Sequence, residues 1–210
     1  MTTCRTPGHS QRPGARFVAI CLFACLLAAC ASREVLIPKS GAVPAGADLS
    51  GTWRLREDAR SAERRINDAI RRTDGVNDRI ILEPMDIPDD RGRVSRPRRN
   101  AGGLVHVFLE YGKTLKVTQT AGGLFLSFDR AVVVEYRFGE NREVQVGPVI
   151  ADRVSGWEGR EYVAETLDQD NMKLTERFSL VNHHTLQRTI VFRGKNGETE
   201  TIVQTFDRVG

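Results

Sequence analysis

The chain has 210 residues, of which 31 are Lys or Arg and 27 are Asp or Glu, so its formal net charge is +4 at pH 7. The first thirty residues hold three arginines and no acidic residue, which leaves 28 basic and 27 acidic side chains in residues 31–210. This near neutrality gives no reason to expect a nucleic-acid partner. All four cysteines also lie in the first thirty residues. The remainder of the chain therefore has no thiol for a disulfide.

The N-terminus has the pattern of a signal peptide. Arg5, Arg12 and Arg16 precede the apolar run "FVAICLFACLLAA", which covers residues 17–29. As a helix, this run spans roughly 20 Å, which is too short for the ~30 Å hydrocarbon core of a bilayer. A cleaved segment is therefore favoured over a transmembrane helix.

The end of this run, Leu27 to Cys30, resembles the lipobox of bacterial lipoproteins. The resemblance implies a lipoprotein signal peptide over 1–29, lipidation of Cys30 and a membrane anchor through the N-terminal lipid. Ala31 stands where some inner-membrane lipoproteins have Asp, which favours the outer membrane of the cell envelope, facing the periplasm. The alternative is a simple secretory signal in which Cys30 is incidental.

The chain after Cys30 divides into a tether and one folded domain. Residues 30–48, which include "SREVLIPKSGAVPAGAD", have no helical or strand period and are predicted to be the lipidated cysteine and a flexible tether. Residues 49–210 are predicted to form a single β-rich domain. Within it, the proline- and arginine-rich residues at about 84–103 are predicted to be a mobile polar insertion.

The domain begins with a strand around Trp53 and continues with a helix over 58–73, whose small and apolar residues recur three and four positions apart. Residues 104–111 favour a short buried helix over a strand. From Leu115 onward the period becomes two, with frequent turn residues. The predicted strands are 115–119, 124–128, 132–138, 143–146, 150–157, 160–168, 172–180, 185–193 and 199–208.

Short sequential strands joined by tight turns predict a mainly β fold, an antiparallel up-and-down barrel of about ten strands with one or two helices inserted after the first strand. The order of these elements resembles the calycins, which include the lipocalins and the fatty-acid-binding proteins. The motifs that carry the resemblance are Gly51-Thr52-Trp53 at the start and residues 205–208, Thr-Phe-Asp-Arg, at the end. By the lipocalin pattern, Arg208 is expected to cover the indole of Trp53.

The carboxylate clamp of the fatty-acid-binding proteins does not carry over. Those proteins use an Arg and a Tyr two residues apart on the last strand, and this chain has Gln204 and Phe206 at the matching positions. The Thr-Asp-Tyr turn of the lipocalins is absent as well. A carboxylate ligand therefore cannot be inferred from the fold resemblance.

A different candidate ligand-binding site comes from single polar residues on apolar strand faces: Glu176 on 172–180, Arg188 on 185–193, and Gln204 on the last strand. A three-residue turn that pairs Leu180 with His184 would set Glu176 opposite Arg188. If Phe192 pairs with Glu200, Gln204 also lies beside Arg188, and Phe206 beside Leu186. We hypothesise that Glu176, Arg188, Gln204 and Phe206 face a cavity and orient the polar end of a lipid-like ligand, since an isolated buried charge is costly. The alternative is a self-satisfied ion pair in a filled core.

No catalytic motif is present, and no cofactor or metal site is predicted. His183 and His184 lie at a predicted turn without a supporting Cys or Asp, so a surface turn is favoured over a metal site. The sequence thus favours an anchored envelope protein, not an enzyme, with a binding or structural role toward an envelope protein partner. The alternative is a calycin-like carrier of a lipid or other apolar molecule.

Overall fold

The computed structural model describes residues 33–74, 105–129 and 132–209. The signal peptide, the lipobox and the polar insertion at about 84–103 lie outside these residues, so those predictions remain predictions. Residues Val35–Gly210 form one compact unit. In the described part of the chain, no helix has both the length and the apolar character needed to cross a membrane.

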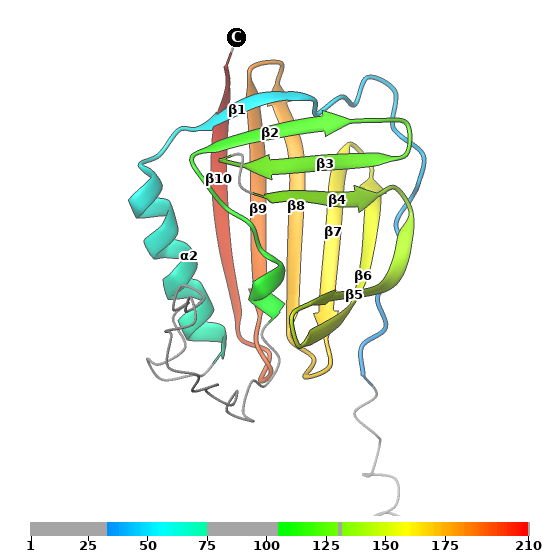
Figure 1. Cartoon of the computed structure of the whole chain (residues 1–210), viewed down its shortest axis with the longest axis vertical. Coiled ribbons are helices and arrows are strands. Elements are labelled where there is room, and N and C mark those ends of the chain that lie inside the picture. Colours follow the sequence, from blue (N-terminus) through cyan, green and yellow to red (C-terminus); the bar gives the residue numbers. More distant parts are fainter. Residues whose placement is uncertain (1–32, 75–104, 130–131, 210) are drawn as a thin grey trace, which may run out of the picture. The chain divides into compact units, whose positions relative to one another are not determined.

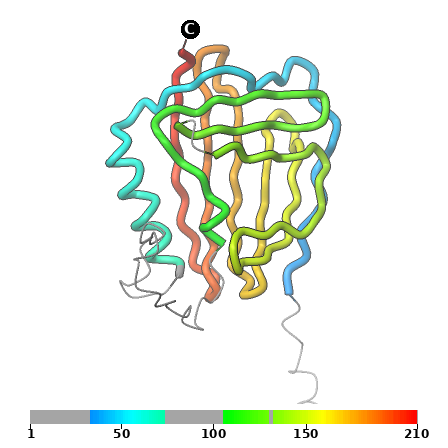
Figure 2. The backbone as a smooth tube through the Cα atoms, viewed as in Figure 1, coloured from blue at the N-terminus to red at the C-terminus, as the bar shows by residue number. Residues whose placement is uncertain are grey.

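The described residues of this unit form ten strands, one α-helix and one 3₁₀ helix (Figures 1 and 2). The strands are β1 (Gly51–Leu55), β2 (Thr114–Gln119), β3 (Gly123–Phe128), β4 (Val132–Arg137), β5 (Glu140–Val146), β6 (Val149–Glu158), β7 (Glu161–Asp168), β8 (Lys173–Asn182), β9 (Thr185–Arg193) and β10 (Thr199–Val209). The helices are α2 (Ala59–Asp74) and the 3₁₀ helix η1 (Val105–Phe108). The predicted strands and the predicted helix are confirmed, with bounds that differ by at most three residues.

All ten strands belong to one antiparallel sheet in the order β4-β3-β2-β1-β10-β9-β8-β7-β6-β5. Strands that are adjacent in the sheet also follow one another in the sequence, except for the pair β1 and β10. The sheet curls so that β1 to β4 pass across β10 to β6 (Figure 1), and β4 also contacts β6. The result is a nearly closed barrel whose two edges are β4 and β5, as the up-and-down prediction requires.

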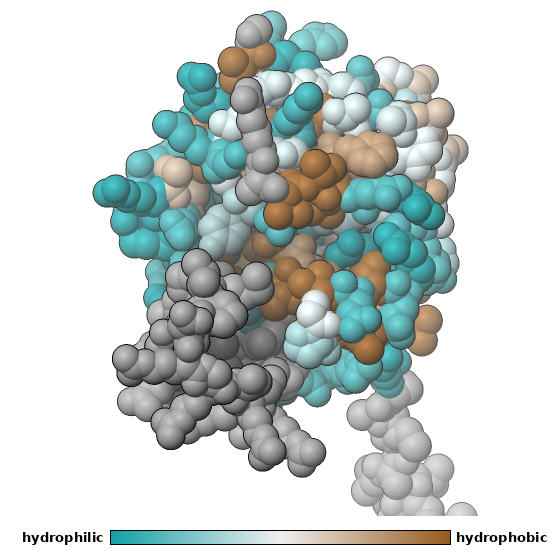
Figure 3. Space-filling model, in the orientation of Figure 1, coloured by the Kyte–Doolittle hydropathy of each residue, from teal (hydrophilic) through white to brown (hydrophobic). Residues whose placement is uncertain are grey.

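Side-chain alternation explains why the sheet folds with one face inward. On β2, Leu115 and Val117 are buried and Lys116 between them is exposed. Successive side chains of a strand point to opposite faces, so one set of residues fills the barrel. The outer surface in Figure 3 is mainly hydrophilic, with a few apolar patches.

The helix α2 lies along β10 and β9, and Figure 1 shows it beside β10. Its N-terminus is capped by Asp58, whose Oδ2 accepts a hydrogen bond from the Ser61 amide at 3.0 Å. Ala62, Ile66 and Ala69 form its buried face. The short buried helix predicted within 104–111 is the 3₁₀ helix η1, with Val105 and Phe108 buried.

The chain before β1 is not a flexible tether. Residues 35–47, here called the strap, pack against the barrel. The Ser40 amide donates to the Trp157 carbonyl at 3.3 Å, and the Trp157 amide donates to the Ser40 carbonyl at 2.8 Å. Leu36 packs with Val154 and Leu167 on the outer face of β6 and β7. The prediction of flexibility over 30–48 is therefore wrong for residues 35–47.

Two carboxylates and one glycine of the barrel hold the strap. The Lys39 Nζ atom lies 2.6 Å from a carboxylate oxygen of Glu158 and 3.2 Å from a carboxylate oxygen of Glu165. At Gly156, an added Cβ would lie 2.4 Å from the Ser40 carbonyl oxygen, so only glycine permits this close approach. Composition predicted a tether because these contacts come from residues more than a hundred positions away in the sequence.

Candidate functional site

The predicted polar row exists and is buried inside the barrel. Glu176, Arg188 and Gln204 are 3%, 1% and 1% exposed. Arg188 binds the Glu176 carboxylate through Nε, at 3.0 Å, and through Nη2. Its Nη1 donates to Gln204 Oε1 at 3.3 Å, and its Nη2 also donates to the Glu110 carbonyl at 2.8 Å. Every nitrogen of the guanidinium therefore has a partner.

The predicted register is correct on one side of Arg188 and wrong on the other. Gln204 pairs with Arg188 and Glu200 with Phe192, as predicted. On β8, however, Phe178 lies opposite Arg188, and Glu176 lies opposite Ile190.

This error has two causes at the turn: only His183 and His184 lie between the paired Asn182 and Thr185, and the register shifts again between Leu180 and Asn182. A register shift of two residues leaves each side chain on its predicted face, because the side-chain period of a strand is two. The long side chains of Glu176 and Arg188 then reach one another diagonally across β8 and β9.

Aromatic residues complete the surroundings of the row. The Arg188 guanidinium lies 4.6 Å from the ring centroid of Phe128 and 5.4 Å from that of Phe178. The Tyr136 hydroxyl donates to Glu176 Oε2 at 2.7 Å. Burial is the largest cause that raises the pKa of Tyr136 well above its ordinary value, and the nearby Glu176 charge adds to it. The phenol therefore stays protonated and keeps donating.

Phe206, the fourth residue of the predicted site, is fully buried and pairs with Leu186 as expected. It belongs to the apolar cluster that includes Trp53, Tyr162 and Phe178. The other polar contacts of the row are made by the Tyr136 hydroxyl and the Glu110 carbonyl. Sequence reasoning missed both, because their strand and loop are far from β8 to β10 in sequence and no periodic signal links them.

A second arginine, Arg153 on β6, also faces the interior. It is 6% exposed, and its Nε donates to Thr166 Oγ1 at 3.0 Å. Its guanidinium lies 5.3 Å from the Phe108 ring centroid and 5.1 Å from that of Tyr136. The sequence contained a signal for it: a single charge on a strand face that otherwise holds Ala151, Ser155 and Trp157. The same rule identified Glu176 and Arg188.

Among the described residues, side chains fill the space between these groups. Trp53, Leu115, Leu124, Tyr162 and Phe206 are 0% exposed. The wall of an enclosed cavity large enough for a small molecule would have accessible surface, so these five side chains do not line one. A cleft at the surface reaches the row: it has about 150 Å³ and is lined by α2, the loop at 111–113 and Gln204. A volume of this size is below the ~300 Å³ typical of small-molecule pockets.

The predicted cover of Trp53 is present at the other end of the barrel. The Arg208 guanidinium lies 4.1 Å from the ring centroid of Trp53, and the two residues pair across β1 and β10. Arg208 also donates to the Ser50 carbonyl and the His183 carbonyl, each at 2.8 Å. This residue therefore ties the first strand to the last strand and to the β8–β9 turn.

The described residues do not define a metal centre. No group of three or more His, Cys, Asp or Glu side chains in the described ranges is placed to hold a metal ion. His183 and His184 are exposed and form the β8–β9 turn.

The described residues form a ten-stranded, nearly closed antiparallel β-barrel with one α-helix after the first strand and a buried polar row inside. This is the order of elements that the sequence predicted. Comparison of the sequence with protein-family models gives no match, and comparison with curated proteins gives none either.

Among solved structures, secretory abundant heat soluble protein 4 from Ramazzottius varieornatus is similar at 13% identity and a TM-score of 0.47, over 80% of this chain and 100% of that chain. A secretory abundant heat soluble (SAHS) protein from the same organism is similar at 13% identity and a TM-score of 0.43, over 77% of this chain and 95% of that chain.

Proposed function

We propose that this protein is a lipid-anchored bacterial envelope protein that acts by binding other envelope components through the outside of its barrel. The observation that carries this proposal is the filled interior, in which every nitrogen of the Arg188 guanidinium donates to Glu176, Gln204 or Glu110. A barrel with such an interior serves as a rigid scaffold, and the surfaces left for recognition are the outer face, the strand edges and the loops.

The anchor in this proposal is Cys30, on the strength of the sequence Leu27 to Cys30. Val35, where the compact unit begins, follows Cys30 by five positions in the sequence. Five residues extend at most roughly 17 Å.

Replacing Cys30 tests the anchor. We expect Cys30→Ser in the full-length chain to leave the membrane fraction and to lose incorporation of labelled palmitate, while Cys25→Ser, inside the apolar run, keeps both. Retention of the Cys30→Ser protein in the membrane with unchanged label would refute the lipid anchor. Density separation of inner and outer membranes then tests the location.

A second candidate function is the carriage of a lipid or other apolar molecule, with Glu176, Arg188, Gln204 and Phe206 as its binding residues. The observation that favours it is the cleft of about 150 Å³ between α2 and the loop at 111–113, which reaches Gln204 from outside. A carrier would need α2 and this loop to separate and admit the ligand to the row. A bound lipid in the purified protein would support this function over the first.

A further inference from the structure

The two arginines inside the barrel differ in one respect: Arg188 has a carboxylate partner and Arg153 does not. Among the described residues, no carboxylate forms an ion pair with Arg153, and Thr166 is the acceptor of its one hydrogen bond, from Nε. Its terminal nitrogens, Nη1 and Nη2, have no acceptor within the described ranges. Neither is among the fully enclosed polar atoms without a partner, so the guanidinium retains a narrow access to solvent. A buried cation without a counter-charge is costly unless an anion joins it.

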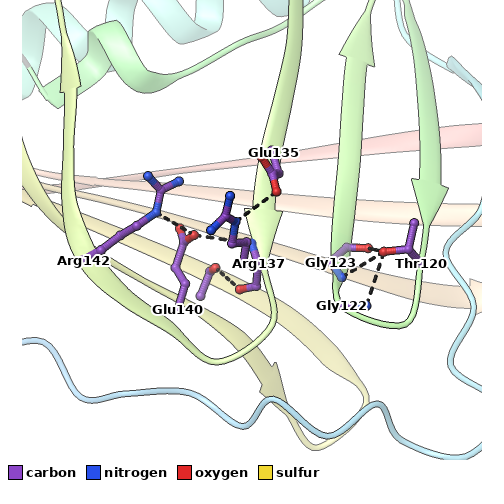
Figure 4. A network of polar contacts seen from close by, with 8 residues as sticks. Thr120, Gly122, Gly123, Glu135, Arg137, Glu140 and Arg142 are labelled. Atoms are coloured by element: carbon purple, nitrogen blue, oxygen red, sulfur yellow. Dashed lines mark hydrogen bonds and ion pairs between the residues drawn. The ribbon is translucent and has the colours of Figure 1, made fainter.

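The strand beside Arg153 adds a second positive charge. Arg142 on β5 is its direct cross-strand partner, so the two side chains lie on the same face of the sheet. Glu140, on that face as well, accepts from Arg142 Nε at 3.1 Å and from the Arg137 amide at 3.4 Å (Figure 4). This carboxylate thus accepts from the Arg142 side chain and from the Arg137 backbone, and it forms no ion pair with Arg153. Asp168, a second buried carboxylate on this face, lies opposite Ala151 on the neighbouring strand β7.

Arg142 and Arg153 lie near the edges of the sheet, where an anion can approach them from solvent. Strands β4 and β5 are the two edges of the sheet and are not paired with each other. Arg142 lies on one of these edge strands, and its side chain is 46% exposed. Tyr136, which faces Arg153, comes from the other edge strand. An anion that binds the Arg153 guanidinium would therefore approach it between the two edge strands, beside Arg142.

We propose that Arg153 binds an oxyanion, a carboxylate or a phosphate group, with its terminal nitrogens, and that Arg142 attracts the anion at the entrance. A guanidinium presents two parallel N–H donors that match the two oxygens of a carboxylate, and phosphate oxygens fit the same fork. Phe108 and Tyr136 hold the guanidinium in place through their ring contacts, so little rotamer freedom remains to be lost on binding. Aromatic side chains fill the space on the inner side of the guanidinium, so the site accommodates only the anionic group. Any chain attached to that group would lie between β4 and β5.

This site differs from the predicted one and does not depend on the lipid anchor. The predicted residues Glu176 and Arg188 neutralise each other, so they offer an anion no net charge. The Arg153 site also fits either proposed function: a free anion would act as a structural or regulatory ligand, and the carboxylate of an amphipathic molecule would define a carrier.

The test uses the full-length protein in detergent and follows the Nε–Hε NMR signal of Arg153, identified by its loss in Arg153→Met. Sodium acetate and inorganic phosphate are titrated separately at constant ionic strength, with chloride as the reference anion. We expect a saturable shift of this signal with acetate, phosphate or both, and no saturation with chloride. Decanoate in place of acetate distinguishes the sources: tighter binding by more than tenfold indicates an amphiphile, and equal binding indicates a small free anion.

Variants separate a binding role from a structural one. In a thermal unfolding assay, the anion should raise the melting temperature of the wild type and of Arg137→Gln, whose side chain is 64% exposed on β4. The gain should disappear in Arg153→Met, and the affinity should fall by roughly ten- to a hundredfold in Arg153→Lys, which keeps the charge and loses the fork. Arg142→Gln should weaken binding by a smaller factor.

Two results would overturn the proposal. One is the absence of any saturable shift of the Arg153 signal with all three anions. The other concerns Glu140, whose Oε1 is buried without a partner. If Glu140→Gln alone moves the Arg153 signal as far as saturating anion does, Arg153 pairs internally with Glu140 in solution, and no anion site exists.

Discussion

Arg188→Met should destabilise the barrel strongly, because it leaves Glu176 as a buried carboxylate whose remaining partner is the Tyr136 hydroxyl. Methionine retains much of the arginine stem and can pack against Phe128 and Phe178. The measured loss therefore reports mainly on the charge and its hydrogen bonds.

The magnitude follows from burial. Breaking a buried ion pair by removal of one partner costs about 3 to 5 kcal/mol. If the interior were instead open and wet, the pair would behave as an exposed one, worth about 0 to 1 kcal/mol. The double variant Arg188→Met with Glu176→Gln removes both charges and keeps an acceptor for Tyr136, so it should recover at least half of the loss.

The assay is chemical denaturation followed by the fluorescence of the two tryptophans, with Arg137→Gln as a surface control expected to change the free energy of unfolding by less than about 0.5 kcal/mol. A loss below about 1 kcal/mol for Arg188→Met would refute the filled interior. So would a double variant less stable than the single one.

Three further predictions concern the strap and the barrel closure. Gly156→Ala should release the strap, seen as lost amide-exchange protection at residues 36–41, whereas Gly122→Ala, with open space around its Cβ, should not. Arg208→Met should cost about 1 to 3 kcal/mol and change the emission of the indole it covers, since it loses a stacked ring and two carbonyl acceptors. The hydrogen bond from Lys39 is the largest cause that lowers the pKa of Glu158, although burial opposes it. A lowered carboxylate pKa stabilises the strap above the ordinary value of 4.5, and this contribution is lost as the pH falls through the folded pKa. Lys39→Met should therefore shift the acid release of the strap amides, followed by NMR, to higher pH.

Most of the fold could be predicted because its signals are local. Alternation of apolar and polar residues identified the strands, and the three-four spacing of Ala62, Ile66 and Ala69 identified α2. The pairing of Gln204 with Arg188 was also predictable, since the turn between β9 and β10 is short and rich in turn residues.

Features that depend on distant contacts were not predictable. The strap appeared flexible because its partners, Gly156 and Glu158, lie in β6. The β8–β9 register was predicted wrongly because neither the length of the turn nor the register shift between Leu180 and Asn182 has a periodic signature in the sequence. Tyr136 was missed as the partner of Glu176 for a similar reason: the two are forty positions apart. Arg153 differs from these cases, because the rule that found Arg188 would have found it.

The proposed function requires a barrel interior that is a filled core without a bound lipid. Native mass spectrometry of the chain from Ser32 onward, purified from cells under non-denaturing conditions, tests it most directly. We predict the mass of the polypeptide without a bound lipid, unchanged after incubation with a panel of fatty acids and phospholipids. A stoichiometric lipid-sized adduct that is lost in Arg188→Met with Glu176→Gln, but kept in Arg137→Gln, would contradict the claim and establish a carrier.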